Sequence, residues 1–566
     1  MLNRAPRLLL SPLLALVMTS SQATVSLGQT AALAVPAQEN PEATIGVLNE
    51  GLQLESQRRW GEALSFYEKA LRDHPADLQL KQRFTTSRIH FSLQKRYSDD
   101  SFVQALRTMD QPQAEGLYSD LLGKIQSHYV TDPKWDSIAR KGLYALDAAV
   151  RDEAFLRQNR LHASDAQIER VRSELRQLSR SPIGNSNQET LRVERQASQL
   201  ATRWIGLSPV ATALEFTAAA AETLDNYSSF LTPAQLQDVY SQIEGNFVGL
   251  GVELKPDNGA LLIVRVIPDS PAQRSGIYDG DRIVAVDGHA TADMSSDAAA
   301  ALLTGEEGSY VKVTVVSPRD SAYSVARPID GKLSSWMGQP STTREVSVRR
   351  EHVDVPSLED VRILDAEYGV AYVRVPVFQK STSRDLDKAL WDLHSKGMRS
   401  LVLDLRGNPG GLLTSSVEMA DKFVAQGNIV STRGRSDGED FDYRAHRAGT
   451  WRVPLVVLID GDSASASEIF AAAIRDNRRG ALVGERSFGK GSVQGIFPLG
   501  RAGAGIRLTT AKFYSPTGQP ISKVGVDPDI VVRRATSSTG GPDVAEAGDE
   551  ALARAVEAAK RQVAMR

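Results

Sequence analysis

The chain has 566 residues, more than one hydrophobic core accommodates, so several domains are expected. Its net charge of −3 gives no sign of nucleic-acid binding, and its 41% hydrophobic and 24% charged residues are ordinary for globular domains. Cysteine is absent, which excludes disulfides, thiolate zinc sites and a cysteine nucleophile. Only 8 histidines occur, and none lies in a zincin-like pattern, so we expect neither a metal nor another cofactor.

The first residues have the features of a secretory signal peptide, which we place at 1–34. Arg4 and Arg7 precede an apolar run, Leu8–Met18, and Ala32–Ala34 provides a small-x-small cleavage site. A membrane anchor is the alternative, but the run is far shorter than the ~20 residues of a membrane span. We therefore expect an exported protein, periplasmic or in the cell envelope, with peripheral membrane association left open.

Residues 40–110 are expected to be helical. The order of apolar and small residues matches the spacing of a tetratricopeptide repeat, and an ordinary helical hairpin fits equally well. Such a hairpin must pack on neighbouring helices, and a tetratricopeptide-like region is a candidate surface for a protein adaptor. The pattern residues are Val47, Gly51, Leu54, Ala63, Tyr67, Ala70 and Pro75.

Residues 111–240 stay helix-rich and include a charged stretch, 151–203, with only a thin apolar stripe. We expect this stretch to form an exposed helical hairpin or insertion.

From 247 to 316 short β-type runs replace the helices, separated by turn signals. A loop excursion and a return strand are expected at 317–360. The β-type runs are Val248–Leu254, Leu261–Val266, Arg282–Val286 and Val311–Val316, with a helix at Met294–Leu303.

Strands and helices alternate from 361 to 534, which predicts an α/β layer around a mostly parallel sheet. Residues 535–566 are expected to be a linker and a loosely held helix. The sequence thus predicts a multidomain α+β protein with an N-terminal helical region, a β-rich domain and an α/β core. The expected core elements are Val370–Val377, Ser383–Ser395, Ser400–Leu405, Ser415–Gln426, Leu455–Asp460, Ala464–Asp476 and Gly480–Gly484.

A serine lies where the apolar strand Leu455–Asp460 runs into a helix. Ser465 stands at this junction, where free helix N–H groups can stabilise an oxyanion. The same residues also form a good capping box, Ser465-x-x-Glu468, and Ser463 could be an N-cap. On these residues alone, capping is the stronger interpretation.

A lysine follows between two glycines, in Phe488-Gly489-Lys490-Gly491, with Gln494 four residues further on. Another chain segment can approach this lysine closely. The alternative is an ion pair, for example with Glu485. A third segment, Asp404–Gly411, ends a strand in a glycine-rich turn, which by itself is only a tight turn.

Together these segments resemble the carboxyl-terminal processing (tail-specific) protease family. They read Asp-Leu-Arg-x-Asn-x-Gly-Gly, then Ser-Ala-Ser-Ala-Ser-Glu, then Phe-Gly-Lys-Gly-x-x-Gln, in that order. Leu224–Pro233, Thr510–Gly518 and Gly525–Asp529 fit as well, so the resemblance covers about 224–534.

The resemblance implies a serine endopeptidase of the Ser–Lys type, in which a lysine replaces the histidine of the usual triad. Ser465 would be the nucleophile, Lys490 the general base and Gln494 the residue that orients it. The backbone N–H groups of Gly411 and Ala466 would form the oxyanion hole.

Residues 247–316 resemble the PDZ module that these proteases carry. The carboxylate-binding loop would be Gly249-Leu250-Gly251-Val252, which would bind the C-terminal tails of protein or peptide substrates. The family also implies that the module gates the active site, with hinges at 236–246 and 344–360. An exported peptide-binding scaffold with a silent core is the alternative function, and the intact Ser465, Lys490 and Gln494 set favours the enzyme.

Overall fold

The computed structural model describes residues 41–257, 259–293, 299, 302–317, 342–446, 448–500, 503–533 and 549–565. The expected signal peptide, most of the helix expected at Met294–Leu303 and most of the excursion at 317–343 lie outside these ranges. Within the described ranges, no helix is long and apolar enough to cross a membrane.

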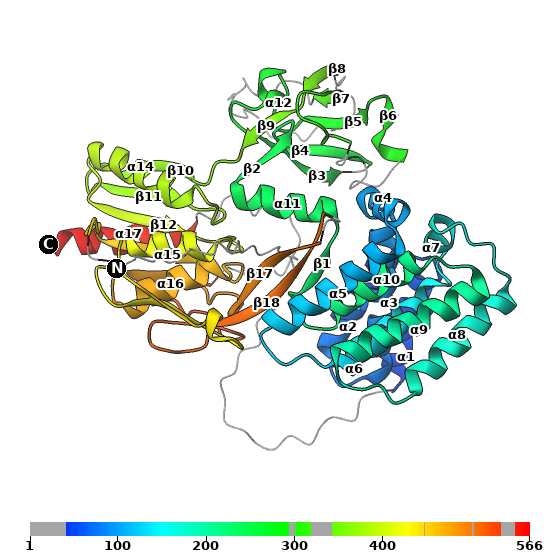
Figure 1. Ribbon diagram of the computed structural model, residues 1–566. Helices are drawn as coiled ribbons and strands as arrows, with labels where there is room; N and C mark the ends of the chain where they lie inside the picture. Colours follow the sequence, from blue (N-terminus) through cyan, green and yellow to red (C-terminus); the bar gives the residue numbers. More distant parts are fainter. Residues whose placement is uncertain are drawn as a thin grey trace, which may run out of the picture.

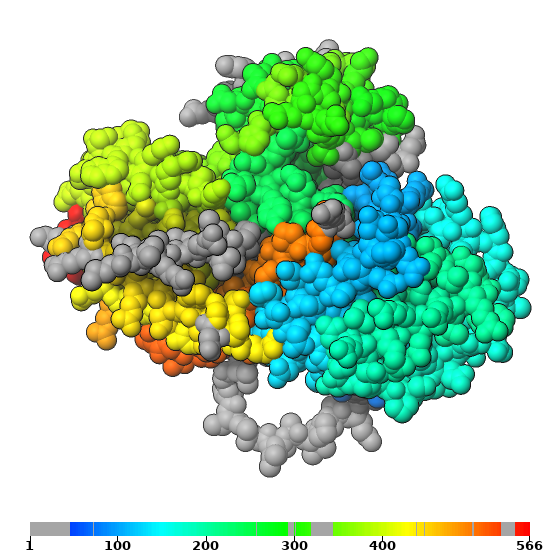
Figure 2. Space-filling model, viewed as in Figure 1, coloured from blue at the N-terminus to red at the C-terminus, as the bar shows by residue number. Residues whose placement is uncertain are grey.

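The chain forms three lobes (Figure 1). Figure 2 shows the β-rich lobe at the top, the α/β core on the left and the helical lobe on the right, with β17 and β18 between the last two. The multidomain α+β architecture expected from the sequence is therefore confirmed.

The helical lobe is built from residues 41–222. Gly51 allows close packing of the first two helices, because a Cβ there would lie 2.3 Å from the Tyr67 ring. Tyr67 also donates a hydrogen bond of 2.8 Å to Glu55. The helices are α1 (Pro41–Ser56), α2 (Trp60–Asp73), α3 (Leu78–Tyr97), α4 (Asp100–Thr108), α5 (Gln111–His128), α6 (Trp135–Ala149), α7 (Glu153–Gln158), α8 (Asp165–Arg180), α9 (Asn187–Ile205) and α10 (Pro209–Glu222).

The charged stretch 151–203 contains the expected helical hairpin, α8 and α9. The thin apolar stripe of this hairpin is buried. It contributes Val171, Leu175, Val193 and Ala197 to the same hydrophobic core as α5, α6 and α10. The hairpin is thus an integral layer of the helical lobe, and two of its charged residues, Arg172 and Glu194, are buried as well.

The β-rich lobe contains a sheet in the order β3-β4-β5-β7-β8, with β6 beside β5. The strand expected at Val248–Leu254 is broken at Gly251, whose φ of +82° turns the chain between β2 and β3. The sheet also extends beyond the expected limit at 316, because β8 pairs with β7 along its whole length. The elements are β3 (Val252–Asp257), β4 (Ala260–Val266), α12 (Pro271–Arg274), β5 (Arg282–Val286), β6 (His289–Ala290), β7 (Tyr310–Ser317) and β8 (Thr342–Arg349).

Two connections join this lobe to the core, at the segments expected to be hinges. The first, 236–246, is mostly the helix α11 (Pro233–Glu244), and the second, 344–360, contains β8 and β9 (Glu351–Asp354). β9 pairs with β2 (Asn246–Gly249), so both connections run side by side as a two-stranded ribbon. Lys380 of the core forms an ion pair with Glu244 at the end of α11.

The core sheet has the order β10-β11-β12-β15-β16-β19, and the strands from β11 to β19 are parallel. Successive residues of each central strand face opposite sides, as the pleat requires. One face packs on α14, α15 and α16, the other on α17. The elements are β10 (Glu359–Asp365), β11 (Val370–Arg374), α14 (Thr382–Ser395), β12 (Ser400–Asp404), α15 (Leu413–Asp421), β15 (Leu455–Ile459), α16 (Ala466–Asp476), β16 (Ala481–Gly484), β19 (Ile530–Val531) and α17 (Glu550–Ala564).

The expectation of a loosely held C-terminal helix is wrong. Ala555 and Ala559 of α17 are fully buried against the sheet, and Lys560 forms an ion pair with Asp365. The Ala-rich sequence reflects close packing, because small side chains let the helix lie directly on Val402, Val456 and their neighbours.

A second sheet links the core to the helical lobe. It has the order β1-β18-β13-β14, with β17 also paired to β18. Leu499 of β17 and Ala504, Ile506 and Leu508 of β18 are buried in the core of the helical lobe, and Val130 donates a backbone hydrogen bond to Thr509. The strands are β1 (Ser229–Leu231), β13 (Asn428–Gly434), β14 (Phe441–Arg444), β17 (Ser492–Leu499) and β18 (Ala504–Tyr514).

Candidate active site

Ser465 occupies a sharp turn between β15 and α16. Its φ of +55° and ψ of −114° lie in a region that side chains other than glycine rarely adopt, so the turn is strained. Such a conformation persists only when neighbouring contacts enforce it, and it is typical of functional turns. Ser465 is 5% exposed and directly precedes the first helical residue, Ala466.

The two neighbouring serines have structural hydrogen bonds. Ser463 Oγ donates to the Leu405 carbonyl over 2.8 Å, and Ser467 Oγ donates to the Asn408 carbonyl over 2.9 Å. Both bonds tie the serine turn to the glycine-rich turn that follows β12. The outer hydroxyls therefore hold the turn, and Ser465 remains the candidate nucleophile.

Glu468 connects the serine turn to the lysine loop. Its buried carboxylate accepts hydrogen bonds from the N–H groups of Ser465 (2.8 Å), Gly489 (2.6 Å) and Lys490 (2.9 Å), and from the Ser487 hydroxyl (2.6 Å). Burial raises the pKa of Glu468, and these hydrogen bonds oppose the rise. The capping-box interpretation anticipated only the bond to Ser465, because the other three come from a loop about 20 residues further along the chain.

Glu468→Ala should therefore damage both stability and activity. The substitution leaves three backbone N–H groups and one hydroxyl without their acceptor, and each buried unsatisfied group costs about 1–3 kcal/mol. We expect a lower midpoint in chemical denaturation and at least ~100-fold slower peptide cleavage at a temperature where the variant stays folded. Glu557→Ala, on the exposed side of α17, is the matched control. Cleavage by Glu468→Ala at the control's rate would contradict this role.

The glycine-rich turn lies directly against the serine turn. A Cβ on Gly410 would stand 2.8 Å from Ser465 Cβ and 3.0 Å from the Ala466 nitrogen, and one on Gly411 would clash with the Phe378 carbonyl. The Asn408 side chain fixes the turn by accepting from the Gly410 N–H (2.8 Å) and donating to the Val375 carbonyl (2.7 Å).

Two backbone donors near Ser465 are available for a ligand. Ala466 is the first residue of α16, where helix geometry leaves the N–H without an intrahelical acceptor. Gly411 lies opposite Phe378 in an isolated β-bridge. The two hydrogen bonds of this bridge are made by the Gly410 carbonyl and the Leu412 N–H, so they do not use the Gly411 N–H. These are the two donors that the sequence analysis assigned to the oxyanion hole.

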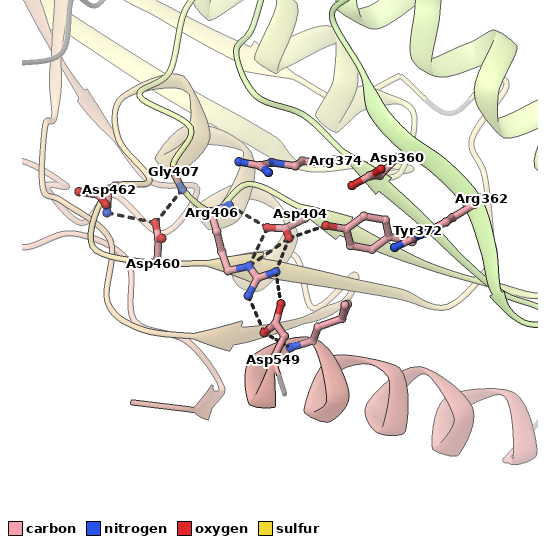
Figure 3. Close-up of a pocket in the computed structure, with 11 residues that line it drawn as sticks. Asp360, Arg362, Tyr372, Arg374, Asp404, Arg406, Gly407, Asp460, Asp462 and Asp549 are labelled. Atoms are coloured by element: carbon pink, nitrogen blue, oxygen red, sulfur yellow. Dashed lines mark hydrogen bonds and ion pairs between the residues drawn. The ribbon is translucent and has the colours of Figure 1, made fainter. Parts of the chain in front are cut away.

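The glycine-rich turn is anchored on its other side by an ionic network (Figure 3). Arg406 donates to Asp404 with its Nε and Nη2, and to both carboxylate oxygens of Asp549 over 2.8 Å. Tyr372 donates to Asp404, and Gly407 donates to Asp460. These residues line a pocket of about 370 Å³. Asp549, the N-cap of α17, thus helps to hold the turn that carries Gly411.

Lys490 is buried, with 7% of its surface exposed. Burial is the main cause that lowers its pKa to about 8, and the nearby positive charge of Arg507 adds to this effect. Glu468 and Asp225 act in the opposite direction. Among the described residues, Lys490 makes no ion pair with a carboxylate, which argues against the ion-pair alternative with Glu485.

Gln494 lies on β17, four residues after Lys490. Its side-chain amide donates to the Ser492 carbonyl over 3.1 Å and to Ser492 Oγ over 2.9 Å. The β17–β18 register has an irregularity between Val493 and Gln494. In the described part of the chain, no hydrogen bond joins the Lys490 amine to Ser465 or Gln494. Catalytic hydrogen bonds are often long in unliganded sites and tighten with substrate.

The predicted carboxylate-binding loop connects β2 to β3. Leu250 is buried in the core of the β-rich lobe, and Gly251 lies so close to Ser270 that no side chain fits there. Gly249 ends β2 and Val252 begins β3. β3 forms the edge of its sheet, so a peptide can add to it as a further strand.

The fold and the site define a class: an α/β peptidase core with a serine at a strand-to-helix turn, a buried lysine and an attached PDZ-type lobe. Family models agree, with peptidase family S41 matching residues 369–532 and the PDZ domain matching 248–322. The chain belongs to the carboxyl-terminal processing protease family of serine-type peptidases.

Two sequence relatives support this assignment, and one solved structure shows a likeness too weak to add to it. The carboxy-terminal-processing protease of Bartonella bacilliformis is 36% identical over 317 residues, 55% of this chain and 67% of the relative. The carboxyl-terminal-processing protease of Picosynechococcus sp. is 36% identical over 312 residues, 54% and 70% of the two chains. A solved photosystem II D1 C-terminal processing protease is 24% identical with a TM-score of 0.36, covering 74% of this chain and 92% of that one.

Proposed function

We propose that this protein is an exported serine endopeptidase that recognises substrates by their C-terminal tails through its PDZ domain. Ser465 is the nucleophile and Lys490 the general base. The observation that carries the proposal is the buried lysine with a lowered pKa, whose loop is fastened to the serine turn by Glu468. Digestion of an unfolded protein by the wild type and by Ser465→Ala tests it.

The reaction follows from these groups. The neutral Lys490 amine takes the proton of Ser465 Oγ while that oxygen attacks the scissile carbonyl carbon. The carbonyl oxygen becomes an oxyanion, which the N–H groups of Gly411 and Ala466 stabilise. The protonated Lys490 then gives its proton to the departing amine, leaving an ester on Ser465. Water, deprotonated by Lys490, hydrolyses this ester and restores the enzyme. Gln494 orients the Lys490 amine when substrate is bound.

Tail recognition is assigned to the loop Gly249-Leu250-Gly251-Val252 and the free edge of β3. A terminal carboxylate would accept hydrogen bonds from the loop N–H groups while the preceding residues pair with β3. The loop carries no positively charged side chain, so the peptide's charge would be met by backbone donors alone.

A peptide substrate with a free, apolar C-terminus should be cleaved faster than its C-terminally amidated counterpart. Amidation removes the charge that the loop N–H groups receive, and hydrogen bonds to a charged group contribute about 1.5–3 kcal/mol. We expect kcat/KM to fall at least ~10-fold, chiefly through KM. Two peptides that differ only by amidation at an internal Asp or Glu are the control. Equal rates for free-acid and amidated tails would overturn the assignment.

The helical lobe and the export signal stay predictions. The helical lobe contacts α11 through α4, because the N-cap Asp99 of α4 accepts a hydrogen bond from Thr232, at the start of α11. A protein adaptor bound to the tetratricopeptide-like hairpin α1–α2 stays a prediction. Export is tested by fusing residues 1–40 to a reporter that functions only outside the cytoplasm.

A scaffold with a silent core would need neither a buried lysine of lowered pKa nor two free backbone donors beside a strained serine. Both features are present, so the enzyme is the better supported function.

A further inference from the structure

The segment Leu224–Pro233 matches the family pattern but has no role in the reaction described above. In the structure it approaches the lysine loop. The Tyr227 ring lies over the Lys490 amine, with 5.1 Å between Nζ and the ring centroid. Tyr227 is 36% exposed, whereas Lys490 is 7% exposed.

The turn that carries Tyr227 is fixed by Asp225. The Asp225 carboxylate accepts hydrogen bonds from the N–H groups of Tyr227 (2.8 Å) and Ser228 (2.7 Å). The turn leads into β1, which pairs with β18 so that Ser229 lies opposite Arg507. The position of the ring over Lys490 is therefore set by backbone contacts on both sides.

Arg507 contacts the residue whose ring covers the amine, and its positive charge acts on Lys490. Its Nε donates to the Tyr227 carbonyl over 3.1 Å, and among the described residues it forms no salt bridge. Burial lowers the pKa of Arg507, and Asp225 opposes this. A guanidinium remains protonated at any usable pH, and holding it beside a buried lysine without a paired carboxylate is costly for stability. Such an arrangement favours a functional role.

We propose that Tyr227 and Arg507 are positioning residues for Lys490: Tyr227 shields the amine from water, and Arg507, held by the Tyr227 backbone, destabilises the protonated amine. The inference rests on the proposed role of Lys490 as general base. It gives the Leu224–Pro233 segment a function, and it places part of the active-site machinery in the turn before β1 and on β18, where the helical lobe is attached.

The charges around Lys490 come from three directions. Arg507 on β18 repels the protonated amine, whereas Glu468 on α16 and Asp225 before β1 attract it. Burial outweighs the attraction, so the amine is neutral in a useful fraction of molecules near neutral pH. Removing the Arg507 charge leaves only the two attractive groups, so the pKa of Lys490 should rise.

The test is independent of catalysis. In full-length protein with Ser465→Ala, the pH dependence of Lys490 acetylation by acetic anhydride is measured by mass spectrometry, with the exposed Lys396 as reference in the same digest. Arg507→Gln keeps a donor for the Tyr227 carbonyl but loses the charge, so the midpoint for Lys490 should move above about 8. Arg507→Lys keeps the charge and should stay closer to the wild-type midpoint. The face of the Tyr227 ring also attracts the protonated amine, so shielding is measured above the midpoint, where Lys490 is neutral: Tyr227→Leu should speed its acetylation there, and Tyr227→Phe, which keeps the ring, should not.

The kinetic consequence is measured by making the same substitutions in the protein that keeps Ser465. On the acid side of the profile, each unit of rise in the pKa lowers kcat about 10-fold, and the deficit shrinks as the pH increases. An unchanged acetylation midpoint in Arg507→Gln, or an unchanged rate above the midpoint in Tyr227→Leu, would overturn the proposal. The expected acetylation changes, combined with no cleavage by the protein that keeps Ser465, would uphold the effect on Lys490 and refute its role as general base.

Discussion

Lys490→Arg should abolish peptide-bond cleavage and leave the protein folded. Arginine keeps the positive charge of a structural lysine, but its guanidinium does not lose a proton at any usable pH. It can therefore satisfy Glu468 and Asp225 electrostatically and cannot accept the proton of Ser465. General-base catalysis contributes about 10²–10⁴-fold, and without it the serine is not activated, so the loss should reach at least ~10³-fold.

Lys490→Met is the matched control, because it keeps the length of the side chain in a site that is only 7% exposed and removes both charge and base. It should be as inactive as Lys490→Arg. The wild-type rate should rise with pH through about 8 and then level off, because only the neutral amine acts as a base. Near-wild-type cleavage by Lys490→Arg would return Lys490 to a structural role and leave Ser465 without a base.

Alanine substitutions of the three serines in the turn should affect activity and stability differently. Ser465→Ala should lower cleavage at least ~10³-fold while the denaturation midpoint changes little, with at most ~1 kcal/mol lost. Ser463→Ala and Ser467→Ala should behave in the opposite way. Each loses a buried hydrogen bond to a main-chain carbonyl, so we expect about 1–3 kcal/mol of destabilisation with measurable activity.

The comparison is made with the four proteins purified in parallel, by kinetics on one peptide and by urea denaturation. A stable but inactive Ser463→Ala or Ser467→Ala, together with an active Ser465→Ala, would move the nucleophile to another position in the turn.

The parallel core could be predicted because its strands are short apolar runs separated by amphipathic helices. Leu455–Ile459 and Ser400–Asp404 are buried on both faces, and their sequences are apolar almost throughout. The antiparallel hairpin β17–β18 was missed, because Gly495, Pro498 and the polar residues of the two strands interrupt any clear alternation. Its stability comes from pairing and from packing against the helical lobe.

The C-terminal helix was misjudged for a different reason. An Ala-rich sequence after a polar linker is compatible with both a free helix and a closely packed one, and only the sheet face beneath Ala555 and Ala559 decides between them.

The candidate nucleophile, base and oxyanion donors were found from the order of three local motifs. The contacts that connect these motifs could not be found from the sequence. Glu468 and Arg507 act on Lys490 across long stretches of sequence, and a single sequence records no such contacts. The glycines of the turn after β12 gave a partial signal, since Gly410 and Gly411 have positive φ and contact backbone from other segments.

Ser465, in its strained turn, should hydrolyse peptide bonds with Lys490 as its base. Digestion of a chemically unfolded protein by wild type and Ser465→Ala tests this role, with products identified by mass spectrometry. We expect internal cleavage products from the wild type and an intact protein with Ser465→Ala. The same fragments at the same rate from both proteins, or an intact substrate from the wild type at every pH tested, would contradict it.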